Sequence, residues 1–257
     1  MLEERAGNRP AYLMTIRTGR VTAMFSNRVE AGRRLAQKVA QTLNSKEDFH
    51  PSEAVVIGLP RGGVPVAAEV ASVLRCPLDV LVSKKIAAPL QPELAIGAVS
   101  SHGIVVLEDK LVIRLGVTPG YIEQQKSRLI KETRELERHW LQAASIQDRP
   151  PLEGRVVIVV DDGIATGMTV LAALRTLQMR GAGMLVVATP VASWDAKRLL
   201  NDECDLFVAL FMPFDFQAVG FFYNDFHQVE DREVVAALRG NGYQSPERGS
   251  HVQPSLS

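Results

Sequence analysis

Two adjacent carboxylates, Asp161 and Asp162, follow a run of five β-branched residues at positions 156–160. A loop rich in glycine and threonine comes next, and an apolar run from Val170 then begins a helix. Carboxylates accept hydrogen bonds from vicinal hydroxyls such as those of a ribose. A glycine loop that opens a helix exposes backbone N–H groups at the positive end of the helix dipole, where phosphate binds. Together these residue types predict a binding site for a sugar phosphate.

Arg61-Gly62-Gly63 forms a second candidate anion-binding loop. It follows another buried-strand pattern, at residues 54–58, and precedes an alanine-rich helix expected at residues 66–74. An arginine guanidinium offers a fork of donors that matches phosphate oxygens. An Arg-Gly-Gly turn alone is more often structural. Paired with the acidic loop downstream, it indicates a ligand that carries phosphate groups at both ends.

Two lysines, Lys84 and Lys85, follow the next strand pattern, at residues 78–82. If that strand belongs to the core sheet, its carboxyl end places both lysines toward the crevice that Arg61 faces. The alternative is that they are ordinary surface lysines at a strand end.

The elements that would position these groups alternate along the chain as strands and helices. Strands are expected at residues 54–58, 78–82, 156–160, 184–188 and 205–210. Helices are expected at residues 26–43, 66–74, 169–180 and 196–200. Such alternation predicts an α/β fold in which helices flank a parallel sheet with right-handed crossovers. The basic residues of the first helix are expected on its solvated faces: Arg28, Arg33, Arg34 and Lys38.

Residues 86–150 form a long insertion with its own elements. Two prolines predict an irregular stretch from residue 86 to 93. Two apolar runs between residues 94 and 107 flank a polar turn and predict a β-hairpin. Thr118-Pro119 then begins a long polar helix.

The bulk composition excludes several classes of function. Lys and Arg number 29, as do Asp and Glu, so no overall charge attracts nucleic acid or an anionic membrane. Cys76 and Cys204 lie far apart in apolar contexts, and the five histidines show no ligand spacing, which disfavours a transition metal held by the protein. No apolar run approaches the roughly 20 residues that span a bilayer. The first residues lack the apolar segment of a signal peptide, so a cytoplasmic location is expected.

The segment Val156–Thr169 closely resembles the phosphoribosyl-pyrophosphate (PRPP) motif of type I phosphoribosyltransferases, with a hydrophobic strand, paired acids and a Thr-Gly-x-Thr loop. Arg61-Gly62-Gly63 resembles the pyrophosphate loop of the same family. The alternative is an ordinary strand, turn and helix with surface acids. The resemblance implies a type I phosphoribosyltransferase-like parallel sheet with a C-terminal hood.

The resemblance also implies roles for particular residues. PRPP would contact Arg61, Gly62, Gly63, Asp161, Asp162, Gly163, Ala165, Thr166, Gly167, Met168 and Thr169. The candidates for catalysis are Asp161, Asp162, Arg61, Lys84 and Lys85. The two acids would hold the ribose and favour positive charge on its ring, and the basic residues would stabilise the departing pyrophosphate. Mg²⁺ would be held mainly by oxygens of PRPP, with no dedicated set of protein ligands.

An aromatic segment at residues 213–226 resembles the hood of purine-type phosphoribosyltransferases, where an aromatic residue stacks on the acceptor base. On that comparison the acceptor would lie near Phe214, Phe216, Gln217 and Ala218. The alternative is a hydrophobic cap or a dimer surface. Hypoxanthine–guanine enzymes carry an acid where Ala165 stands, so its absence counts against that acceptor without naming another.

The expected activity is transfer of ribose 5-phosphate from PRPP to an unidentified acceptor, with nitrogenous bases as the expected class, and release of pyrophosphate. The alternative is a non-catalytic protein of this fold that senses PRPP and regulates. A homodimer is expected, without nucleic-acid or membrane partners. The expected organisation is an N-terminal extension at 1–24, a phosphoribosyltransferase domain at 25–239 with an insertion near 86–150 and a hood near 211–230, and a disordered tail at 240–257.

Overall fold

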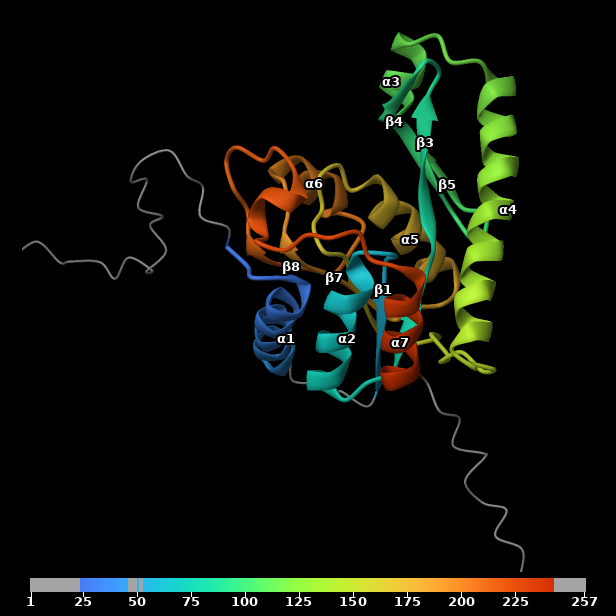
Figure 1. Ribbon diagram of the computed structural model, residues 1–257. Helices are drawn as coiled ribbons and strands as arrows, with labels where there is room; N and C mark the ends of the chain where they lie inside the picture. Colours follow the sequence, from blue (N-terminus) through green and yellow to red (C-terminus); the bar gives the residue numbers. More distant parts are fainter. Residues whose placement is uncertain (1–23, 46–49, 51–52, 243–257) are drawn as a thin grey trace, which may run out of the picture.

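The computed structural model describes residues 24–45, 50 and 53–242. Its core is a five-stranded parallel sheet in the order β2-β1-β6-β7-β8 (Figure 1). The strands are β1 (Ala54–Gly58), β2 (Leu78–Val80), β6 (Val156–Val160), β7 (Met184–Val191) and β8 (Leu206–Phe211). The predicted α/β fold with a parallel sheet flanked by helices is confirmed.

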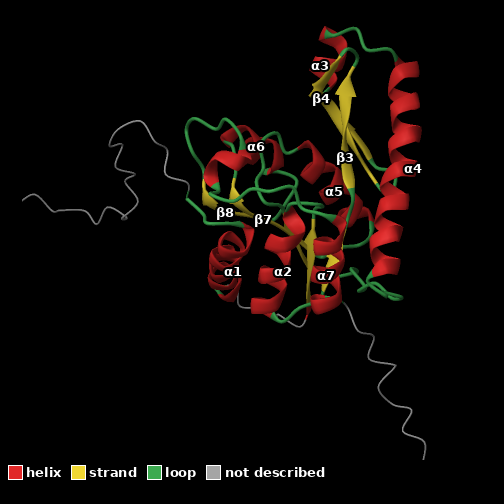
Figure 2. Ribbon diagram, viewed as in Figure 1, coloured by secondary structure: helices red, strands yellow, loops and turns green. Residues whose placement is uncertain are grey.

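Helices cover both faces of this sheet (Figure 2). Helices α1 (Arg28–Asn44), α2 (Gly63–Leu74) and α7 (Asp231–Asn241) share one hydrophobic cluster with Val56 and Ile158. Helices α5 (Met168–Met179) and α6 (Trp194–Leu200) share another with Val55 and Val157. Successive strand residues point to opposite faces, so strands covered on both sides need continuous β-branched runs.

Residues 83–143 form an arm that projects from this core (Figure 1). A three-stranded antiparallel sheet contains β3 (Ser83–Ala88), β4 (Gln91–Ser100) and β5 (Val105–Leu107). The short helix α3 (Asp109–Arg114) lies near its tip, and α4 (Pro119–Ala143) runs beside the strands. Thr118 caps α4 by accepting a hydrogen bond from the N–H of Tyr121, as its sequence predicts.

The arm corrects two expectations. The stretch from 86 to 93 is only partly irregular: residues 89 and 90 turn and the flanking residues belong to β3 and β4, but the pairing register shifts on both sides of Ala87. The strand expected at 78–82 ends at Val80, and Lys84 and Lys85 belong to β3 instead. After Val80 the N–H of Leu81 still donates to the carbonyl of Gly58 in β1, whereas the N–H of Val82 donates to Glu137 of α4.

The sheet order creates a crevice beyond the carboxyl ends of β1 and β6. Strand β1 pairs with β2 on one side and β6 on the other, and Gly58 lies opposite Val160. The chain thus winds away from β1 in both directions, and ligands of open α/β sheets bind at such a switch point. The loops after β1 and β6 contain both predicted anion-binding motifs.

The ends of the chain lie mostly outside the described residues. Of the predicted extension at 1–24 only Met24 is described, and the predicted tail at 240–257 is described as far as Gly242. Helix α7 continues to Asn241, two residues into that tail. Within the described part of the chain, no helix has the length and apolar character needed to cross a membrane.

Candidate functional site

The loops after β1 and β6 are in direct contact. The N–H of Leu59 donates to the carbonyl of Val160 over 2.9 Å. A Cβ atom added to Gly62 would collide with the Asp162 carboxylate, and one added to Gly63 would lie 2.6 Å from the Val160 carbonyl oxygen. Only glycine fits this close approach. The structure thus brings together the two motifs that the sequence predicts to share a ligand.

The loop from Ala165 to Gly167 leads into the N-terminus of α5. Gly167 adopts a left-handed conformation with φ 79° as the residue before the helix. Among the described residues, no acceptor pairs with the backbone N–H groups of Thr166, Met168 or Thr169. These free donors and the helix dipole are the groups that an anion site needs, and the Thr-Gly-x-Thr pattern predicts such a site here.

Asp162 is held by groups that the sequence did not reveal. Arg28 Nε lies 2.8 Å from Asp162 Oδ2, and both side chains are largely buried. The Tyr223 hydroxyl donates to the Asp162 backbone carbonyl over 2.6 Å. The expectation that Arg28 faces solvent is wrong. Its spacing of three residues before Ala31 and seven before Leu35 places it on the buried stripe of α1, a signal available in the sequence.

Burial raises the pKa of both acids. For Asp161, burial raises the pKa well above the ordinary value, the charge of Asp162 raises it further, and Lys85 opposes both. For Asp162, burial raises the pKa and Arg28 opposes the change. When both acids are ionised, Arg28 and Lys85 therefore do not fully offset their buried negative charge. A ligand that offers hydroxyl donors or positive charge would stabilise the ionised pair.

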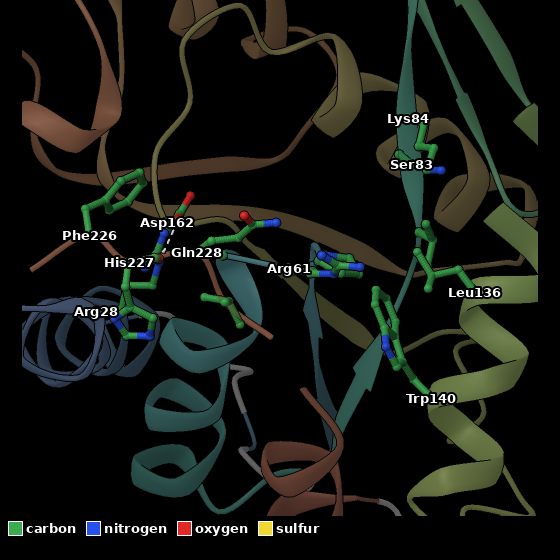
Figure 3. Close-up of a pocket in the computed structure, with 14 residues that line it drawn as sticks. Arg28, Arg61, Ser83, Lys84, Leu136, Trp140, Asp162, Phe226, His227 and Gln228 are labelled. Carbon is green, nitrogen blue, oxygen red and sulfur yellow. Dashed lines mark hydrogen bonds and ion pairs between the residues drawn. The ribbon is translucent and has the colours of Figure 1, made fainter. Parts of the chain in front are cut away.

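The Arg61 pocket is a cavity of about 610 Å³ beside the first loop. Basic side chains in its lining are Arg28, Arg61, Lys84 and His227 (Figure 3). Arg61 Nε lies 3.0 Å from Asp231 Oδ1, and Lys84 Nζ lies 3.0 Å from Glu132 Oε2. Both ion pairs are partly exposed, so an incoming anion can replace the carboxylates. The sequence did not single out the other lining residues Ser83, Trp140 and Gln228.

Lys84 and Lys85 point to opposite faces because they are consecutive residues of β3. Lys84 lines the Arg61 pocket and pairs with α4. Lys85 is exposed and absent from that lining, but its charge acts on Asp161. The two lysines therefore approach the crevice from different directions rather than as one pair.

The Phe216 pocket is a second cavity, of about 800 Å³. It adjoins the loop at residues 165–169, which is the predicted phosphate loop. Its lining comes from three segments: Ala165 and Thr166, residues 213–217 of the hood with Phe214, Asp215, Phe216 and Gln217, and the N-cap and body of α6 with Ser193, Trp194, Asp195 and Arg198. Ala218 lies outside its lining. The hood packs closely against the acidic loop at Gly163, where an added Cβ would collide with Val219.

Ser193, Trp194 and Arg198 were not predicted as site residues, although Ser193 comes soon after the end of β7 and so lies at the same edge of the sheet. Ser193 Oγ donates to the carbonyl of Ala165 over 2.5 Å and fixes this segment to the phosphate loop. The rings of Trp194 and Phe214 stack with their centroids 6.5 Å apart.

Comparisons with known proteins agree with this geometry. Residues 23–222 match the family model described as a phosphoribosyl transferase domain. Over 216 residues the chain is 43% identical to two Mycobacterium tuberculosis proteins, named "Putative phosphoribosyl transferase" MT0597 and Rv0571c. The match covers 84% of this chain and 46% of each relative, so the chain spans about half the length of these curated relatives.

Among solved structures, TT1426 from Thermus thermophilus is 37% identical with a TM-score of 0.69. That match covers 85% of this chain and 99% of the other. The family match, the relatives and the paired loops at the switch point of the sheet lead to one conclusion: the chain belongs to the phosphoribosyltransferase family.

Proposed function

We propose that this protein transfers the 5-phosphoribosyl group of PRPP to a nitrogenous base and releases pyrophosphate. In this reaction the bond from ribose C1 to the pyrophosphate oxygen breaks, and the oxygen keeps the electron pair. A bond from C1 to a nitrogen of the base forms, and the nitrogen releases its proton to solvent. The chemistry therefore needs stabilisation of a cationic ribose ring and of an anionic leaving group.

The observation that carries the proposal is the contact between the Arg61-Gly62-Gly63 loop and the Asp161-Asp162 pair. One loop offers an arginine and the other offers carboxylates and free N–H groups at a helix N-terminus. A ligand with a diol between two phosphate groups matches this order. In the proposal Asp161 binds the ribose hydroxyls, while Arg28 and Tyr223 hold Asp162 in place beside it.

Mg²⁺ fits this site as an ion bound chiefly through the substrate. No cluster of three or more His, Cys, Asp or Glu side chains suited to a metal occurs among the described residues. Mg²⁺ usually keeps several waters and binds through one or two carboxylates and substrate phosphates. In the proposal Asp161 would contribute a carboxylate, and the ion would neutralise charge on the pyrophosphate.

The Phe216 pocket suits the acceptor. Aromatic rings at its rim provide stacking surfaces for a planar base. Its carboxylates come from Asp195 and Asp215, whereas Ala165 supplies none. These features support a planar base, but they do not choose among bases.

Titration with PRPP and Mg²⁺ by calorimetry tests the proposal. Asp161→Asn should weaken PRPP binding roughly a hundredfold, because two hydrogen bonds to an ionised acceptor become weaker. Asp109→Asn makes the same change of charge on α3 of the arm and should leave the affinity unchanged. Undiminished affinity in Asp161→Asn would end the assignment of the ribose site.

Turnover is tested separately, by pyrophosphate release from PRPP with a panel of purine and pyrimidine bases. Release that depends on one base would identify the acceptor. Tight PRPP binding without release for any base would instead favour the alternative, a protein that senses PRPP.

A further inference from the structure

Unpartnered buried polar atoms gather around the Arg61 pocket. Among the described residues, the buried side-chain polar atoms without a hydrogen-bond partner are Ser83 Oγ, Trp140 Nε1, Arg180 Nη1 and Asp231 Oδ1. Ser83 and Trp140 line this pocket, and Asp231 Oδ1 forms the ion pair with Arg61 at its edge. Roughly nine in ten buried polar groups in proteins are paired. Two orphans in the wall of one cavity therefore require an explanation by function.

The Trp140 indole can act only as a donor. Its side chain is 0% exposed, so the N–H cannot turn outward to bulk solvent. Figure 3 shows Trp140 and Leu136 reaching the pocket from α4, while Ser83 and Lys84 reach it from β3. The arm thus supplies a wall of the pocket opposite the loop of the core sheet.

Two hydrogen bonds between Glu137 of α4 and residues next to β3 and β4 fix this wall. Glu137 Oε2 accepts from the N–H of Val82 over 2.9 Å and from Ser101 Oγ over 2.6 Å. Val82 immediately precedes Ser83, and Glu137 lies one helical turn before Trp140. The two unpartnered groups are therefore held in position before any ligand binds, which lowers the entropy cost of binding.

The charges around the wall select an anion. Arg28 is already neutralised by Asp162, but Arg61 and Lys84 pair only with partly exposed carboxylates. An N–H donor, a hydroxyl and two cations that can change partners match the oxygens of a polyphosphate.

We propose that Trp140 Nε1 and Ser83 Oγ donate hydrogen bonds to the pyrophosphate group of PRPP and to free pyrophosphate, opposite Arg61. The proposal rests on the proposed function and extends it to the arm. The arm then acts as a fixed side of the leaving-group site, built from residues far from both sequence motifs.

The two tryptophans of the chain provide a direct readout. Trp194 lies in the Phe216 pocket and Trp140 in the Arg61 pocket. In Trp194→Phe, Trp140 alone reports, and titration with magnesium pyrophosphate should change its emission. In Trp140→Phe, Trp194 alone reports and should respond weakly to pyrophosphate.

Calorimetry with magnesium pyrophosphate then measures the hydrogen bonds. Trp140→Phe keeps the aromatic ring but removes the N–H, and Ser83→Ala removes the hydroxyl. Each should weaken binding at least about tenfold, as expected for a lost hydrogen bond to a charged acceptor. Ser83→Thr, which keeps the hydroxyl, should restore most of the affinity.

Tyr121→Phe is the matched control on the same helix. Its hydroxyl donates to the carbonyl of Ala87 over 3.0 Å within the arm, outside the pocket lining. This variant should lower the melting temperature without changing the affinity for pyrophosphate. A general loosening of α4 would instead weaken binding in Tyr121→Phe and Trp140→Phe alike, and would overturn the proposal.

The remaining outcomes separate the two proposals. Unchanged affinity in both Trp140→Phe and Ser83→Ala, with weaker binding in Arg61→Ala, would show that ordered water satisfies the two groups, and would refute this inference alone. Failure of the wild-type protein to bind PRPP would refute the proposed function. If Trp140→Phe does not fold, Ser83→Ala and the emission of Trp140 in Trp194→Phe still decide the question.

Discussion

Arg149 and Arg28 both bind buried carboxylates, but in different surroundings. The arm cluster consists of Arg149, Asp79 and Glu137, and it joins β2 to α4. Arg149 lies 2.8 Å from Asp79 and 2.7 Å from Glu137, and its remaining nitrogen donates to the carbonyl of Val80. Burial alone would lower the pKa of Arg149, but the two carboxylates outweigh burial and raise it.

The site cluster consists of Arg28, Asp161 and Asp162. One arginine faces two adjacent acids and contacts only Asp162. Burial dominates here, so the pKa values of both acids are raised in spite of Arg28 and Lys85. The surroundings of Arg149 favour its charged form, whereas those of Asp161 and Asp162 disfavour theirs.

This contrast separates structure from function. A buried cluster whose charges neutralise one another, such as the arm cluster, holds one element against another and needs no ligand. A buried cluster with unneutralised charge, such as the site cluster, lowers the stability of the folded protein when no ligand is bound. Strongly shifted pKa values of this kind gather at functional sites. The same contrast applies to hydrogen bonds, since Trp140 lacks a partner while its neighbour Glu137 has several.

Arg149→Ala should have the largest effect on stability. It leaves two buried carboxylates without their cation, which costs about 3–5 kcal/mol of unfolding free energy. Urea unfolding measures the loss. Arg175→Ala is the control, because the Arg175–Glu203 pair is more exposed and should contribute less than about 1 kcal/mol. Equal losses in the two variants would mean that the arm cluster does not hold the arm to the core.

Asp161→Asn should change stability in the opposite direction. Because the folded pKa is raised, the folded state binds more protons than the unfolded state between pH 3.8, the ordinary value, and the raised pKa. As pH rises through that window, Asp161 therefore lowers the unfolding free energy of the wild-type protein. Above the raised pKa this loss of stability is complete. The variant should gain about 1 kcal/mol, or roughly 2–4 °C in melting temperature, at pH 8.

The gain from Asp161→Asn should vanish below pH 3.8, where the wild-type carboxyl is protonated in both states. Melting curves of the two proteins at several pH values provide the check. A variant that is less stable than wild type at pH 8 would contradict the view that the site cluster is uncompensated.

His227→Gln should have the smallest effect. Hydrogen bonds to Glu233 and Asp225 raise the pKa of His227, which lines the Arg61 pocket. As pH rises through that pKa the pocket loses a positive charge, and pyrophosphate affinity should fall roughly two- to fivefold, as for an exposed charge pair. Because pyrophosphate itself titrates, the quantity to compare is the ratio of the affinities of wild type and variant at each pH. Parallel profiles of affinity against pH would exclude a role for His227.

The local patterns of the sequence determined most of the core. The β-branched runs at 54–58 and 156–160 predicted strands buried on both faces, and the glycine loops after them predicted anion sites. The strand predictions are confirmed because strand periodicity depends on neighbouring residues. The anion sites stay a prediction. The arm was harder to predict because its prolines occur in and beside a hairpin turn, where local rules also allow an irregular loop.

The tertiary structure alone decided which distant side chains complete the site. Arg28 and Asp162 are 134 residues apart, and Val82 and Glu137 are 55 apart. No local pattern links such pairs, because their contacts arise from the order of strands in the sheet and from the packing of α4 against β3. The sequence therefore determined the two motifs and predicted a class of ligand for them. The fold determined their partners, the second pocket and, within the described residues, the unpaired donors of the arm.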